Sequence, residues 1–133
     1  MARDYRALAG FIAGRETAPF AFGRRANDCV AYCSGAVAAQ TGKDPLKGLR
    51  WSTEAGAARL LRRFGGLAEA VSSRLTEIPP ATAHRGDVAG VADEAVPGGI
   101  RLMIVEGELL VGPGDAGNVR MRRSAMKRAW SAG

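Results

Sequence analysis

A cysteine that follows two polar residues is the first feature of this sequence that suggests chemistry. Asn27-Asp28-Cys29 precedes the apolar run CVAYCSGAVAAQT, and Asn and Asp are both good helix N-caps, so Cys29 is predicted in the first turn of a helix over 29–41. Backbone N–H groups and the helix macrodipole favour a thiolate there and lower the pKa of a cysteine. Cys29 is therefore a candidate nucleophile for acyl transfer, provided that a base and oxyanion donors accompany it.

A structural role is the competing hypothesis for Cys29. A free cysteine is most often a small, buried and inert core residue, and composition alone favours this interpretation. Cys33 lies one helical turn further on, where the geometry is poor for a disulfide, so we expect both thiols to be reduced and the protein to be made in a reducing compartment.

Metal or cofactor chemistry is not predicted. The spacing CxxxC supplies two ligands, and the single histidine of the chain, His84, supplies at most a third. His84 precedes Arg85-Gly86-Asp87 in a predicted loop, where a lone histidine is more often a solvated side chain than a base or a ligand.

The elements that must position Cys29 change in character along the chain. Apolar spacing and capping residues predict helices over 3–14, over 29–41, from a Ser52 or Thr53 cap to Gly65-Gly66, and over 67–74. In the third helix we expect Ala57, Leu60, Leu61 and Phe64 to face inward. Beyond Pro79-Pro80, strands are predicted at 87–91, 100–105 and 109–111, with a hairpin tip at Glu106-Gly107.

This order of elements predicts an α+β fold, in which helices of the N-terminal half pack on a small antiparallel sheet from the C-terminal half. The chain has the length of one domain, residues 1–133. Within it we distinguish a helical half (1–80), a strand meander (81–115) and a basic C-terminal segment (116–133).

The positive charge is concentrated at the C-terminus of the sequence. Five of the 19 Lys and Arg residues and none of the 13 acids lie beyond Asp115, so this segment carries +5 of the net charge of +6. Such a segment suits an acidic partner. Nucleic acid is the weaker alternative, because no aromatic platform except Trp130 accompanies the charge.

No membrane span is predicted, since no apolar run approaches the roughly 18 to 20 residues that a bilayer requires. Arg3, Asp4 and Arg6 interrupt any signal-peptide core at the N-terminus, so we expect no signal peptide, in agreement with synthesis in a reducing compartment.

Several short motifs, taken in their order, carry a family resemblance that covers most of the chain. They are Phe22-Gly23, Asn27-Asp28-Cys29, 41–45 (TGKDP), 53–56 (TEAG), 85–88 (RGDV) and Ala129-Trp130. This order resembles an NlpC-like family found in tail modules of bacteriophages, prophages and gene transfer agents, which is itself similar to papain-fold cell-wall peptidases.

The resemblance implies a role for some residues and denies one to others. It makes Cys29 the nucleophile and places Gly86-Asp87 at the start of the first strand. The family's catalytic histidine would fall near Arg101, which cannot act as a base at neutral pH. The third polar residue would fall around Val111 or Gly112, and neither side chain can orient a base.

Two hypotheses follow from the resemblance. The first is a catalytically silent copy of the peptidase fold in the virion tail, bound to other tail-tip or hub proteins through the basic C-terminal segment. The second is an active thiol peptidase or amidase that cleaves peptidoglycan peptides during cell entry. The replacement of the histidine favours the first, because catalytic residues act as a unit.

Overall fold

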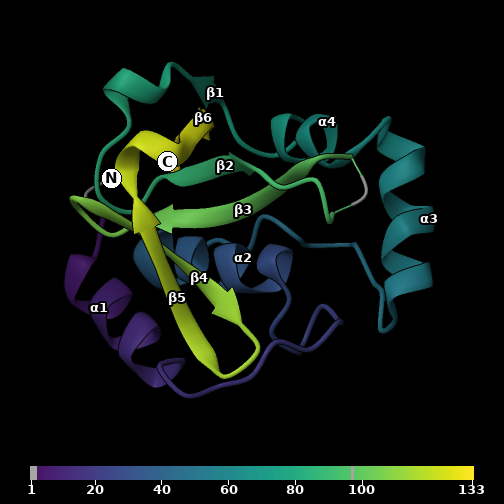
Figure 1. Ribbon diagram of the computed structural model, residues 1–133, viewed down its shortest axis with the longest axis horizontal. Helices are drawn as coiled ribbons and strands as arrows, with labels where there is room; N and C mark the ends of the chain where they lie inside the picture. The colour runs from purple at the N-terminus through teal and green to yellow at the C-terminus, as the bar shows by residue number, and fades with distance from the viewer. Residues whose placement is uncertain (1–2, 97) are drawn as a thin grey trace.

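The computed structural model describes residues 3–96 and 98–133 and has an α+β fold, as expected: N-terminal helices pack on an antiparallel sheet from the C-terminal half (Figure 1). In the described residues the α-helices are α1 (Tyr5–Gly14), α2 (Cys29–Thr41), α3 (Glu54–Phe64) and α4 (Leu67–Ser72).

The sheet has six strands in the described part of the chain, where the sequence predicted three. They are β1 (Glu77–Ile78), β2 (Val88–Ala92), β3 (Ile100–Val105), β4 (Leu109–Gly114), β5 (Gly117–Arg122) and β6 (Met126–Trp130), in the order β1-β6-β2-β3-β4-β5. Short 3-10 turns at Pro80–Thr82 and Arg123–Ala125 link β1 to β2 and β5 to β6. The basic C-terminal segment (116–133) is part of the sheet, with β6 inserted between β1 and β2.

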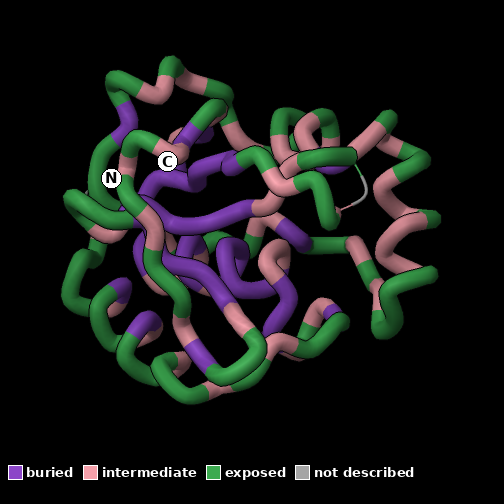
Figure 2. Tube along the Cα trace, in the orientation of Figure 1, coloured by how far each residue is buried: buried purple, intermediate pink, exposed green. Residues whose placement is uncertain are grey.

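Helix α2 is the central helix of the fold. Its first and last turns follow the predicted capping chemistry, with the Asp28 side chain accepting from Ala31 N and Gly42 ending the helix at a φ of 76°. Tyr32, Ala36 and Val37 are buried in the core that α2 shares with α1 and the sheet (Figure 2). A helix that is apolar on nearly all sides is therefore covered on most of them.

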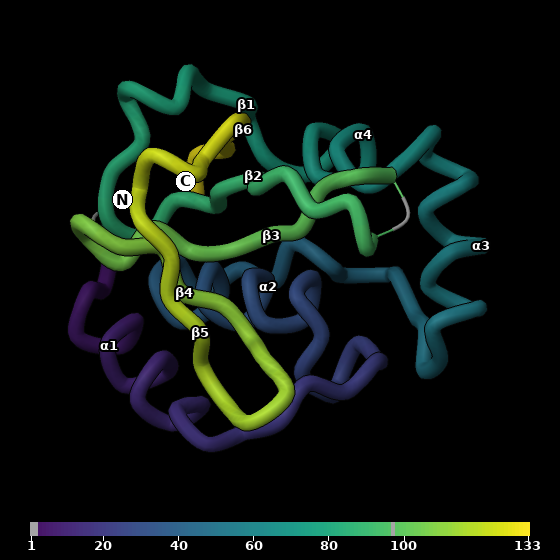
Figure 3. The backbone as a smooth tube through the Cα atoms, in the orientation of Figure 1, coloured from purple at the N-terminus to yellow at the C-terminus, as the bar shows by residue number. Residues whose placement is uncertain are grey.

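Helix α3 differs from the other helices because it lies at the margin of the molecule, apart from the sheet (Figure 3). None of its residues is fully buried. The four residues expected to face inward (Ala57, Leu60, Leu61 and Phe64) do so, but they are only half-buried and line a cavity. Helical periodicity identifies the apolar face of α3 but not how closely the rest of the protein approaches it.

Candidate functional site

Asp28 fixes the start of α2 and with it the position of Cys29. One carboxylate oxygen accepts from Ala31 N at 2.8 Å, and the other accepts from Gly23 N at 3.0 Å and from Trp51 Nε1 at 2.7 Å. Asp28 is almost fully buried, so these bonds replace the water that its charge would otherwise hold. Asp28 therefore acts as a positioning residue for the start of α2.

Asn27 holds the chain that leads into the helix. Its Nδ2 donates to the carbonyls of Ala18 and Pro19, both at 3.1 Å, and its Oδ1 accepts from Arg15. The Asn27-Asp28 pair singled out in the sequence therefore builds the loop around Cys29 rather than supplying reacting groups.

The Cys29 thiol is half-buried and lies on the wall of a cavity of about 530 Å³. Burial raises the pKa of the Cys29 thiol above its ordinary value, and this effect outweighs a hydrogen bond with the Leu102 backbone and the nearby Arg101 guanidinium, which both lower the pKa. The lowered pKa expected from the helix start is therefore wrong. At neutral pH the thiol keeps its proton and is a poor nucleophile.

Arg101 lies beside Cys29, at the position where the resemblance places a histidine. The ladder between β3 and β4 covers only Ile104 with Val111 and Val105 with Leu110, and beyond these pairs the strands diverge (Figure 1). Arg101 spans the gap by donating to the Pro113 carbonyl at 3.2 Å, and its guanidinium lies 3.8 Å from the Asp93 carboxylate.

The residues expected to hold the third polar position have no such role. Val111 and Gly112 are buried inside β4. The group that meets Arg101 is the backbone carbonyl of Pro113, one residue beyond the expected range. Neither residue expected at the third position forms a hydrogen bond with Arg101, and the backbone carbonyl of Pro113 does so instead.

His84 lies at the far end of α2 from Cys29. Gln40 Nε2 donates to the Gly86 carbonyl at 3.0 Å, which places the turn that contains His84 at the C-terminal end of the helix. Cys29 and Gln40 are eleven residues apart, which corresponds to about 16 Å along a helix. The His84 side chain is 61% exposed, and its Nδ1 lies 3.3 Å from Asp87 Oδ2. It is not in a position to take a proton from Cys29.

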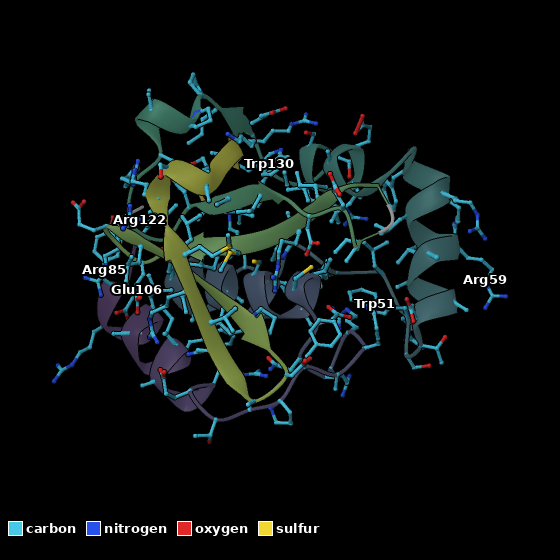
Figure 4. All side chains as sticks on the ribbon, in the orientation of Figure 1. Trp51, Arg59, Arg85, Glu106, Arg122 and Trp130 are labelled. Carbon is cyan, nitrogen blue, oxygen red and sulfur yellow. The ribbon has the colours of Figure 1, made fainter. Side chains whose placement is uncertain are left out.

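The cavity beside Cys29 was not predicted from the sequence. Its walls are mainly apolar and come from α2, α3, α4 and the loops at 20–22 and 45–51. Trp51 lies between the start of α2 and the start of α3 and forms part of this wall (Figure 4). The one signal in the sequence was the amphipathic third helix, whose apolar face lines the cavity.

The described residues contain no group of three or more His, Cys, Asp or Glu side chains arranged to hold a metal ion. In the same part of the chain, no helix has the length and hydropathy needed to cross a bilayer. Cys29 and Cys33 are both free thiols, as expected.

The basic C-terminal segment is partly neutralised by acids from elsewhere in the fold. Arg120 contacts Glu16 at 2.9 Å and Glu106 at 2.8 Å, and Arg128 contacts Glu77 at 2.8 Å. A third base, Arg123, donates to the Ala83 carbonyl. The excess of +5 counted along the sequence is therefore much reduced in space.

Comparison with known proteins assigns the chain to a family. Residues 2–132 match the family described as Domain of unknown function (DUF6950), and because the match spans nearly the whole chain, the protein belongs to this family. No curated protein matches the sequence.

Proposed function

We propose that this member of the DUF6950 family is a catalytically silent relative of the NlpC-type thiol peptidases and serves as a structural component of a tail tip or hub in a phage-type particle. The observation that carries the silent assignment is that Arg101 shares the cavity wall with Cys29, while the single histidine lies at the other end of α2. The placement in a tail rests on the order of motifs that resembles the tail-module family.

The chemistry beside Cys29 supports a loss of activity. A thiol peptidase needs a base that takes the sulfur's proton and later gives it to the leaving amine. Arg101 stays protonated at neutral pH and cannot do either. Burial also raises the pKa of the Cys29 thiol, which disfavours the thiolate further.

The competing candidate is an active thiol peptidase or amidase that acts on peptidoglycan peptides. Two observations favour it: Cys29 opens a helix, and its thiol lines a cavity large enough for a substrate side chain. Nucleic-acid binding through the C-terminus is weaker, because Arg120 and Arg128 are held by carboxylates.

The deciding experiment measures the turnover of purified peptidoglycan fragments by the wild-type protein and by Cys29→Ser. We expect no product from either protein beyond the background of the buffer. Fragment cleavage by the wild type that Cys29→Ser abolishes would establish the enzyme and overturn the silent assignment.

The structural role is tested in the particle. Particles that carry Cys29→Ser are expected to assemble and infect as the wild type does, whereas deletion of the gene is expected to remove intact tail tips. A normal tail assembled without the protein would contradict the structural role.

A further inference from the structure

The segment that borders the cavity is rich in bases without an ion-pair partner, and two of them, Arg50 and Arg74, line the cavity or the hollow next to it. Residues 42–75 contain seven bases and three acids. Across the described residues, none of these seven bases lies in an ion pair. The seven are Lys43, Lys47, Arg50, Arg59, Arg62, Arg63 and Arg74. This segment forms α3, α4 and the loop before them, which together make one side of the cavity.

The cavity itself is an apolar groove with its long wall supplied by α3 and α4. Leu60, Leu61 and Phe64 line one side, and Val30, Val37 and Leu102 line the other. The α3 residues are half-buried, so their apolar surface is only partly covered by the chain itself. Unlike the core around Tyr32, this groove has room for side chains of another molecule.

A second hollow adjoins the groove and brings further arginines to its mouth. The two hollows share Phe22, Leu49 and Trp51 in their walls. Arg25 and Arg50 line the second hollow. Arg74 lines the groove from the end of α4 and donates to the Lys47 carbonyl at 3.0 Å, so the end of α4 and the loop at 43–50 meet there.

Four acids line the groove, and two of them are already engaged. Asp28 is buried and bonded to Trp51 and two backbone amides, and Asp93 lies beside Arg101. Glu54 and Asp115 are exposed on the groove, whereas the second hollow, which holds Arg25 and Arg50, is lined by no acid among the described residues.

We propose that this groove docks an acidic segment of a partner protein, which inserts one or two apolar side chains between α3 and α2 while its carboxylates pair with Arg25, Arg50 and Arg74. An apolar groove with a basic rim is complementary to a segment that alternates apolar and acidic residues. The inference deepens the proposed function and rests on it, because a groove without catalysis beside Cys29 is free to hold a partner permanently.

The chemistry of the groove favours a peptide over other anions. A nucleic acid would use the charge but leave the apolar walls unfilled, since Trp51 is tied to Asp28 through its N–H and Phe22 packs edge-on against Phe20 at 4.9 Å between ring centroids. A membrane surface is flat and cannot fill a groove enclosed by two helices.

The test uses a library of random peptides of about twelve residues displayed on yeast and selected on the full-length protein. We expect enriched peptides to carry one or two large apolar residues flanked by Asp or Glu. The affinity of a synthetic enriched peptide is expected to fall about tenfold or more in the variant Arg25→Glu/Arg50→Glu/Arg74→Glu.

A matched control has the same change of charge on the opposite face of α3. Arg59, Arg62 and Arg63 lie on the side away from the apolar residues, and Arg59 projects away from the body of the molecule (Figure 4). Arg59→Glu/Arg62→Glu/Arg63→Glu is expected to reduce the affinity much less. Equal losses of peptide affinity in the two triple variants would show a diffuse electrostatic effect and overturn the proposed docking site.

A second measurement does not depend on any substitution. A peptide in the groove covers Cys29, so saturating peptide is expected to slow the alkylation of Cys29 by iodoacetamide by about tenfold or more. Binding without protection of Cys29 would place the peptide elsewhere and overturn the proposal.

The remaining outcomes separate this inference from the proposed function. Binding of a single-stranded oligonucleotide or of phosphatidylglycerol vesicles, with no peptide enriched, overturns the peptide groove but leaves the silent assignment standing. Cleavage of the enriched peptide that Cys29→Ser abolishes, measured by mass spectrometry, overturns the silent assignment instead.

Discussion

At Cys29 two effects act on the thiol in opposite directions. The start of α2 and the Arg101 guanidinium favour the thiolate, while burial against the groove wall favours the thiol, and burial is the larger effect. The raised pKa of Cys29 is therefore determined more by burial than by the position of the residue at the start of α2. This is the reverse of a catalytic cysteine, where the charged partners prevail.

Alkylation of Cys29 by iodoacetamide tests this balance. Because the pKa of the thiol is raised, the rate is expected to stay low at pH 7 and to rise with an inflection above about 8.5, the ordinary value for a free cysteine. Arg101→Met removes a charge that lowers the pKa, so its inflection is expected at a still higher pH. Cys29→Ala reports the background from buried Cys33, and an inflection below pH 8 in the wild type would contradict the account.

At the level of elements, the close approach of α1 to α2 holds the central helix in place. Gly35 lies on the face of α2 against the Phe11 ring, and a Cβ at this position would lie 2.5 Å from Phe11 Cε2. The same ring packs edge-on against Tyr32 at 5.3 Å between centroids. The glycine thus permits a contact between the two helices that any larger residue would push apart.

Two glycine-to-alanine substitutions in helices should therefore have opposite effects. Gly35→Ala is expected to lower the free energy of unfolding by about 1–3 kcal/mol, because the added methyl group overpacks the contact with Phe11. A Cβ at Gly10 in α1 meets nothing within 4 Å, so Gly10→Ala should raise the free energy of unfolding by up to about 1 kcal/mol through helix propensity. Urea unfolding monitored by circular dichroism measures both values, and a stabilised Gly35→Ala would show that the helices separate freely.

Across the whole molecule, Asp87 joins parts of the chain that are far apart in sequence. Its fully buried carboxylate accepts from Arg3 Nη2 at 2.6 Å, from His84 N at 2.9 Å and from Ala132 N at 3.0 Å. The Arg3 side chain also donates to the Arg85 carbonyl at 2.9 Å. The Gly86-Asp87 pair that the sequence marked as a strand start therefore anchors α1, β2 and the segment after β6 together.

Removal of this carboxylate should be costly. Asp87→Ala leaves the nearly buried Arg3 guanidinium and two backbone amides without their acceptor, so we expect the free energy of unfolding to fall by about 3–5 kcal/mol. Glu94→Ala changes an exposed acid in the loop after β2 and should stay within about 0.5 kcal/mol of the wild type. Comparable urea midpoints for the two variants would rule out Asp87 as an anchor.

The helices were predictable because their signals are local. Asp28 and Gly42 bound α2, and Thr53 and Gly65 bound α3, as capping chemistry indicated. The fold class followed from the order of the elements. The cysteine at a helix start was likewise visible in the residues themselves.

The features that only the tertiary structure decided depend on contacts between residues distant in the sequence. Strands β1, β5 and β6 went unpredicted because they are short or rich in arginine, and β6 exists as a central strand only through pairing with β1 and β2. The compensation of Arg120 by Glu16 and Glu106 joins segments separated along the chain. The raised pKa of Cys29 and the groove beside it have the same origin: burial and cavities arise from how elements pack, which no local pattern of residues records.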